Sequence, residues 1–180
     1  HIQPGDTSKS NYGLAMDIGT TTIFGQLIEL STGAILGQYG KFNSQISYGE
    51  DVISRIIYAE RPGGLTKLQE VAIECINTVI DEVVKSAGIL KENISTITMA
   101  GNTTMTQLFL GIDPSYLRRA PYVPASTLYP PFQASTIGLD LPEHTKALLY
   151  PNISSYVGGD IVAGVMGCGM YRHEEITLFM

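Results

Sequence analysis

The stretch Leu14-Ala15-Met16-Asp17-Ile18-Gly19-Thr20-Thr21-Thr22-Ile23-Phe24-Gly25 decides how this chain folds. It predicts a short apolar strand that ends in a carboxylate, a glycine turn rich in hydroxyls, and the start of a second strand. Gly19 lets backbone N–H groups approach an anion closely, because no Cβ stands in the way. The three threonines add hydroxyl donors, and Asp17 suits a hydrated Mg²⁺. The turn therefore favours a nucleotide phosphate.

The same stretch has a plainer interpretation. A turn of this composition also closes ordinary β-hairpins, where glycine supplies a positive φ angle. Successive threonines suit a strand edge as well. Short motifs match by chance often enough that this one needs support from the rest of the chain.

The elements predicted outward from this turn alternate between strands and helices. Residues 1–13 are polar and predict a linker. Strands are predicted over 14–18, 23–30, 34–42, 94–100 and 147–150, with a further strand beginning over 176–180. Helices are predicted over 50–59, 65–87, 103–110 and from Gly158 to about Met170. In the first helix Val52, Ile53, Ile56 and Ile57 are expected to share the buried face.

This order of elements is typical of the ribonuclease-H-like lobe of actin-like ATPases. The fold class predicted is therefore α/β, with a mixed five-stranded sheet flanked by helices. The first three strands are close enough in sequence to form an antiparallel meander. Residues 14–175 would form this lobe, and residues 176–180 would begin a second lobe.

The composition limits the classes of function. The chain has 180 residues, of which 44% are hydrophobic and 16% charged, which indicates a folded domain. A net charge of −6 argues against nucleic acid or an anionic membrane as the main partner. No apolar run reaches the ~18 residues of a membrane helix. Cys75 and Cys168 cannot form a zinc or iron–sulfur site alone; both are expected in the core, in a cytoplasmic protein.

Three predicted strands lead into polar glycine turns. They are Asp17-Ile18-Gly19-Thr20, Gly101-Asn102-Thr103-Thr104 and Val157-Gly158-Gly159-Asp160. Ligands gather at the carboxyl ends of strands in an open α/β sheet, so the three turns are expected to converge on one ligand. Taken singly, Asn102 and Asp160 are equally well explained as residues that stabilise the first turn of a helix.

The expected roles follow from the residue types. The turn Gly19–Thr22 would wrap the β- and γ-phosphates of ATP, and Asp17 would reach Mg²⁺ through water. Asn102 and Thr103 would face the γ-phosphate, and Asp160 would orient the attacking water or accept its proton. Gly101, Gly158 and Gly159 would let the backbone approach the ligand. No cation is evident at the turns, and Arg55 and Arg172 are expected at the surface or at an interface.

With these motifs in place, the chain resembles the reductive activators of corrinoid proteins, within the acetate and sugar kinase/Hsc70/actin superfamily. The stretches that carry the likeness are Ala15–Thr22, Asn43–Ile56, Gly101–Met105, Leu108–Pro114, Pro121–Pro124, Pro151–Ile153 and Val157–Asp160. The phosphate turn is shared across the superfamily, whereas the Asn-Ser-Gln-Ile-Ser-Tyr-Gly-Glu-Asp-Val run and the Gly-Asn-Thr-Thr-Met turn are specific to this branch.

The resemblance implies an ATPase that couples ATP hydrolysis to electron delivery. A ferredoxin-like domain with a [2Fe–2S] cluster, absent from this chain, would pass an electron to a Co(II) corrinoid protein and return it to Co(I). The nucleotide would lie between two lobes, of which this chain is the first. The chain alone is therefore expected to hydrolyse little ATP, and whether it forms a homodimer is left open.

Two other classes of function compete with this one. The first is a lobe of a small-molecule kinase, in which Asp160 would deprotonate a substrate hydroxyl. The second is an interaction domain that keeps the fold without hydrolysis. The segment 43–51 also has two interpretations: it contacts the corrinoid partner or lines the cleft, or it is a solvated loop that bonds its own backbone.

Overall fold

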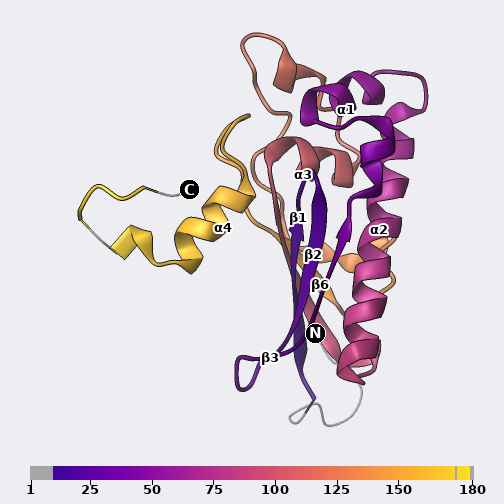
Figure 1. Cartoon of the computed structure of the whole chain (residues 1–180), viewed down its shortest axis with the longest axis vertical. Helices are drawn as coiled ribbons and strands as arrows, with labels where there is room; N and C mark the ends of the chain where they lie inside the picture. The colour runs from indigo at the N-terminus through magenta and orange to yellow at the C-terminus, as the bar shows by residue number, and fades with distance from the viewer. Residues whose placement is uncertain (1–9, 173, 179–180) are drawn as a thin grey trace.

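A computed structural model describes residues 10–172 and 174–178 of the chain. Its centre is a mixed sheet in the order β3-β2-β1-β4-β6-β5 (Figure 1). The strands are β1 (Tyr12–Ile18), β2 (Thr22–Glu29), β3 (Ala34–Phe42), β4 (Ile94–Gly101), β5 (Phe132–Gln133) and β6 (Lys146–Leu149). The helices are α1 (Val52–Ala59), α2 (Gly64–Ala87), α3 (Thr103–Leu110) and α4 (Gly159–Gly167).

The pairing of the strands explains where polar turns collect. β1 pairs antiparallel with β2, and β2 pairs antiparallel with β3, so the predicted meander is confirmed. β1, β4 and β6 run parallel to one another. The carboxyl ends of these three parallel strands therefore meet at one edge of the sheet, as in other open α/β sheets.

The core lies between the sheet and α2. Alternate residues of β1, namely Leu14, Met16 and Ile18, point into it and are buried. The predicted stripe of α2 is buried along its whole length: Leu68, Val71, Ala72, Cys75, Ile76, Val79, Ile80 and Val83. Full burial of such an aliphatic side chain contributes roughly 1.5–3 kcal/mol, so this contact holds the sheet in place.

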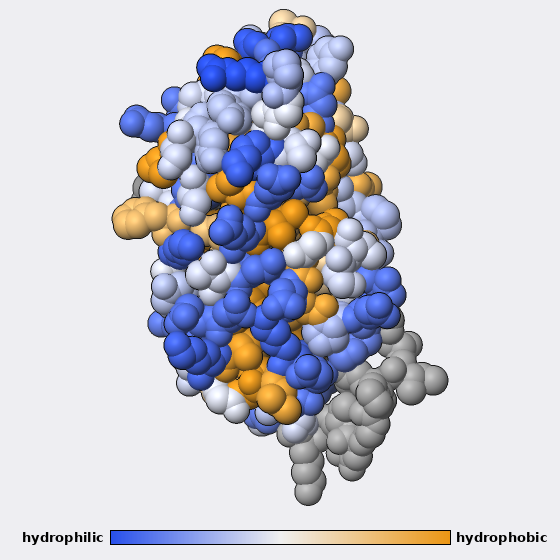
Figure 2. Space-filling model, turned by 90° about the vertical axis from the view of Figure 1, so that its right-hand side faces the viewer, coloured by the Kyte–Doolittle hydropathy of each residue, from blue (hydrophilic) through white to orange (hydrophobic). Residues whose placement is uncertain are grey.

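The two faces of the sheet are covered differently. α2 lies along one face, and the shorter α4 lies on the opposite side (Figure 1). The outer surface of α2 is mostly hydrophilic, with smaller apolar patches between the polar side chains (Figure 2). Within the described residues, no helix is long and apolar enough to cross a membrane.

The strand prediction was wrong in two places. The α/β class is confirmed, but the sheet has six strands, because the two-residue strand β5 pairs antiparallel with β6. A strand this short, within a segment rich in proline, leaves no alternating pattern to detect. The strand predicted over 176–180 is not formed at residues 176–178, and residues 179–180 lie outside those described.

The predicted face of α1 was also wrong. Ile53 and Ile57 are exposed, whereas Arg55 and Ile56 are buried. One of the two cysteines was misplaced as well, since Cys75 is buried but Cys168 is exposed. β1 begins at Tyr12, two residues earlier than predicted, and residues 1–9 of the predicted linker lie outside the described part of the chain.

Candidate functional site

The first of the three turns, Gly19–Thr22, leaves the carboxyl end of β1. A Cβ on Gly19 would lie 2.5 Å from the carbonyl oxygen of Thr22, so the turn folds back too tightly for any other residue. Thr21 and Thr22 are exposed on its outer side, and Gly19 and Thr20 are half-buried. Asp17 precedes the turn by two residues, and its side chain is exposed on the sheet face that α2 does not cover.

The second turn joins β4 to α3 and touches the first. The side-chain amide of Asn102 donates to the Thr20 hydroxyl at 3.0 Å. Its carbonyl oxygen accepts from the Met105 backbone N–H at 2.9 Å, which caps α3. Asn102 therefore caps α3, as one of its two interpretations predicted, and it also connects two turns that lie 82 residues apart in sequence. Its role toward a phosphate stays a prediction.

The third turn packs directly on the second. A Cβ on Gly158 would lie 2.5 Å from the Cα of Asn102 and 2.8 Å from the Thr103 nitrogen. The buried Thr103 hydroxyl donates to the carbonyl of Ser154, so this side chain joins the turns and does not face open space. Asn152 accepts from the Gly159 N–H at 2.8 Å, which holds the start of α4.

Two carboxylates lie in this region, Asp17 on β1 and Asp160 on α4, and the charge of Asp160 acts on Asp17. Although Asp17 is solvent-exposed, the surrounding protein removes part of its hydration, and this desolvation together with the smaller effect of the Asp160 charge raises the pKa of Asp17 above its ordinary value. Asp160 lies in the first turn of α4 and is half-buried. Two carboxylates that repel each other at a strand end are stabilised by a cation, and Mg²⁺ takes one or two carboxylates plus water and phosphate oxygens. The donor set therefore fits a hydrated Mg²⁺ ion.

Beside Asp17 lies a hollow of about 440 Å³; Asp160 is not among its lining residues. Asp17, Phe24 and Gln26 line it from β1 and β2, and Ala163 and Gly167 line it from α4. Gly101 and Gly159 pack tightly where other strands end: added Cβ atoms would lie 2.9 Å from the Ile18 carbonyl and 2.8 Å from the Tyr150 carbonyl. All the residues predicted for the site thus come from one edge of the sheet.

Sequence reasoning missed the residues behind the first turn. Asn43 and Gln45, at the start of the segment 43–51, are fully buried and therefore not solvated, although Asn43 does accept from the Gln45 backbone N–H, as the loop interpretation predicted. Whether the segment lines a ligand cleft or contacts a partner stays a prediction. Asn43 donates to the Gly19 carbonyl at 2.9 Å, and Arg55 donates to the Thr20 carbonyl at 2.7 Å. The expectation that Arg55 lies at the surface was wrong; Arg172, by contrast, is exposed. A single charged residue amid the apolar residues of α1 was the available signal.

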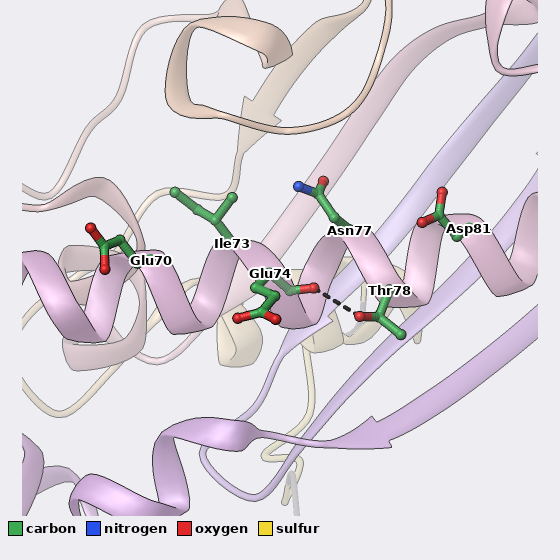
Figure 3. A pocket seen from close by; sticks show the side chains of 6 residues that line it. All are labelled: Glu70, Ile73, Glu74, Asn77, Thr78 and Asp81. Carbon is green, nitrogen blue, oxygen red and sulfur yellow. Dashed lines mark hydrogen bonds between the residues drawn. The ribbon is translucent and has the colours of Figure 1, made fainter.

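A second hollow, of about 450 Å³, lies on the outer side of α2. Figure 3 shows that its lining side chains all come from this one helix: Glu70, Ile73, Glu74, Asn77, Thr78 and Asp81. The Thr78 hydroxyl donates to the Glu74 carbonyl of its own helix at 2.9 Å. Asn77 bonds the loop at residues 138–140. The Thr78 and Asn77 side chains of this hollow already bond other parts of the fold, so the hollow is a weaker candidate for a ligand site.

The described residues hold no other candidate metal site. Within the described ranges, no three His, Cys, Asp or Glu side chains gather as a metal site. The two cysteines of the chain cannot supply the four ligands of an iron–sulfur cluster.

Comparison with known proteins gives consistent matches. A family model described as RACo middle region matches residues 12–173. The corrinoid activation enzyme RamQ of Eubacterium limosum is 36% identical over 184 residues, which cover 99% of this chain and 30% of that protein. A solved structure of a reductive activator for corrinoid, iron–sulfur protein superposes with a TM-score of 0.93 at 45% identity, covering 97% of this chain and 28% of that chain. The chain thus spans less than a third of the length of either relative.

Proposed function

Because this chain belongs to the RACo family of reductive activators of corrinoid proteins, matching its middle region, we propose that it forms the first of two lobes that bind ATP. The observation that carries the proposal is the contact between the turns. Asn102 bonds Thr20 at 3.0 Å, and Gly158 lies against Asn102. Helix capping alone requires no contact between three turns so far apart in sequence.

Each turn has a separate role in this proposal. Backbone N–H groups and hydroxyls of Gly19–Thr22 bind the β- and γ-phosphates. Asp17 holds Mg²⁺ through water, and the ion, when bound, supplies neutralising charge to the phosphate oxygens. Asn102 orients the γ-phosphate. Asp160 orients a water molecule that attacks the γ-phosphorus while the bond to the β–γ bridging oxygen breaks, which releases ADP and phosphate.

The activity proposed for the full-length protein is the reduction of a Co(II) corrinoid protein to Co(I). One electron would come from a [2Fe–2S] cluster on a domain outside this chain. ATP hydrolysis would supply the free energy for this uphill step. The name of the superposed structure, a reductive activator for corrinoid, iron–sulfur protein, and that of the corrinoid activation enzyme RamQ both support this proposal.

The test uses the full-length protein with a corrinoid protein. We expect Asp17→Asn to lower ATP hydrolysis and ATP-dependent formation of Co(I), followed by absorbance, by at least about a hundredfold, the scale for loss of one transition-state charge contact. Asp81→Asn, which changes a carboxylate in the α2 hollow, is the matched control and should leave both rates unchanged.

Other outcomes would favour the competing functions. Transfer of phosphate to a small-molecule hydroxyl, without any dependence on the corrinoid protein, would indicate a kinase. Equal activity of the wild-type and Asp17→Asn proteins would indicate an interaction domain without hydrolysis.

A further inference from the structure

Behind the first turn lies a buried cation that forms no direct ion pair among the described residues. Arg55 of α1 is 0% exposed. Its guanidinium donates to the Thr20 carbonyl at 2.7 Å, to the Gly49 carbonyl at 2.9 Å and to the Gln45 side chain at 3.2 Å. With the Met105 sulfur at 3.2 Å, these acceptors take four of the five N–H donors of the guanidinium, and all four acceptors are uncharged.

The charge of Arg55 survives its burial. Among the ion pairs of the described residues, none includes Arg55. Burial lowers the pKa of Arg55, and the nearby carboxylate of Asp51 opposes that effect only in part. An arginine side chain nevertheless stays protonated in proteins. A buried, unpaired charge costs free energy in the folded protein, and an anion that binds nearby recovers part of it.

The peptide groups of the turn show where that anion would lie. The carbonyls of Gly19 and Thr20 point back to Asn43 and Arg55, which bind them. In a trans peptide the N–H points opposite to the C=O of the same unit. The N–H groups of Thr20 and Thr21 therefore face away from the buried network, and within the described chain neither donates to a backbone carbonyl.

The geometry points to Arg55 as a positioning residue that sets the preference of this site for highly charged phosphates. Its hydrogen bond to the Thr20 carbonyl fixes the peptide unit that carries the Thr21 N–H, while Asn43 fixes the unit that carries the Thr20 N–H. The buried charge of Arg55 attracts the β- and γ-phosphates through the unit that it holds. This inference rests on the proposed nucleotide site and deepens it, because it names the group that separates nucleoside triphosphates from monophosphates. Arg55 also supplies a positive charge next to the first turn, whereas the residues of the three turns themselves include no lysine or arginine.

The experiment measures the affinities of the full-length protein for ATP, ADP and AMP by titration calorimetry. We expect Arg55→Gln to weaken ATP binding by about tenfold or more, the scale of a unit charge several ångströms away at intermediate dielectric. AMP binding should change by less than about twofold, because its single phosphate lies outside the turn. Arg55→Lys keeps the charge and should restore most of the preference for ATP over AMP.

The matched control is Arg118→Gln. Arg118 is also a cation that contacts the α1 region, but its side chain pairs with the Glu60 carboxylate, and among the described residues it donates to no carbonyl of the three turns. We expect the Arg118→Gln variant to bind ATP and AMP with the affinities of the wild type. A purely structural role of Arg55 predicts something else: equal weakening of all three nucleotides by Arg55→Gln, in step with a lower melting temperature, and no restoration by lysine. That result overturns the inference.

The proposed function and this inference fail in different ways. If the wild-type protein binds no nucleotide, both the proposed function and this inference are wrong. If the wild-type protein binds ATP but the Arg55→Gln variant keeps the wild-type ratio of ATP to AMP affinity, only this inference is wrong. If the variants do not fold, the Nε–H resonance of Arg55 in selectively labelled wild-type protein decides: ATP should shift it and AMP should not, and equal responses overturn the inference.

Discussion

Two hollows of nearly equal volume, about 440 and 450 Å³, differ in how they are built. The hollow beside Asp17 is lined by residues of β1, β2, β4 and α4 and by Tyr150, so its lining comes from distant parts of the sequence. The hollow on α2 is lined by one helix (Figure 3). The first brings together side chains from three strands and α4, among them the carboxylate of Asp17. In the second, polar groups bond their own helix or a neighbouring loop. Volume therefore says less about function than the origin of the lining residues.

The largest effect is expected where two turns touch. Gly158→Ala would place a Cβ against the backbone of Asn102, where no flexible side chain can move aside. We expect a loss of about 1–3 kcal/mol in the local unfolding free energy, the usual cost of overpacking. Hydrogen exchange of the α3 and β4 amides measures it.

Gly167→Ala is the matched control in the same helix, because a Cβ there meets nothing within 4 Å. Its stability should be unchanged or slightly higher. Equal exchange rates in both variants would show that the second and third turns are not packed together as described.

Two asparagine substitutions, one at the turns and one in the α2 hollow, should cost similar amounts of stability but differ in their effect on ATP binding. Asn102→Ala removes a helix cap and the bond to Thr20. Asn77→Ala removes bonds to Gly138 and Asp140. Each should cost about 1 kcal/mol of stability, but only Asn102→Ala should weaken ATP binding, by about tenfold. Loss of ATP affinity in Asn77→Ala would contradict the assignment of the site.

A smaller effect concerns the dependence of stability on pH. Because the pKa of Asp17 is raised, the folded state disfavours its carboxylate more than the unfolded state does. Asp17 therefore lowers stability above its folded pKa, and this cost fades as pH falls toward the ordinary value of 3.8. Asp17→Asn should stabilise the lobe at pH 7 by less than about 1 kcal/mol, since solvent screens the site.

The same measurement separates the two causes of the shift. Asp160→Asn removes the charge repulsion, which is the smaller cause, and it also removes a carboxylate that favours the first turn of α4. Its gain in stability at pH 7 should therefore be smaller than that of Asp17→Asn. Denaturant titrations at pH 7 and near pH 3.5 measure both gains. A gain that persists unchanged at the lower pH would mean that ionisation of Asp17 does not produce it.

The smallest effect is expected in the α2 hollow. The double variant Glu70→Gln with Glu74→Gln removes two charges there. The only ion pair involved joins Lys67 to Glu70 at 3.9 Å on the surface, among the described residues. Stability should change by less than about 0.5 kcal/mol, and ATP affinity should stay within about twofold of the wild type. A larger change in affinity would return this hollow to consideration as a ligand site.

Much of this protein was predictable from local sequence pattern. The alternation over β1, the apolar stripe of α2 and the glycine turns after the strands are properties of neighbouring residues. The fold class and the grouping of the turns at one edge follow from them, because parallel strands bring their carboxyl ends together. The roles of Asp17, Asn102 and Asp160 at that edge stay predictions.

Tertiary structure alone decided what lies behind the turn. Sequence pattern treats an arginine in a helix as a surface residue, since burying a charge is costly. Arg55 is buried because the carbonyls of Thr20 and Gly49 and the side chain of Gln45 come from segments that meet only once α1 packs onto the lobe. Such hydrogen bonds between distant segments leave no periodic trace in the sequence. The sequence by itself therefore determined the strands, the main helix and the turns, while the folded chain decided which buried groups hold the first turn in shape.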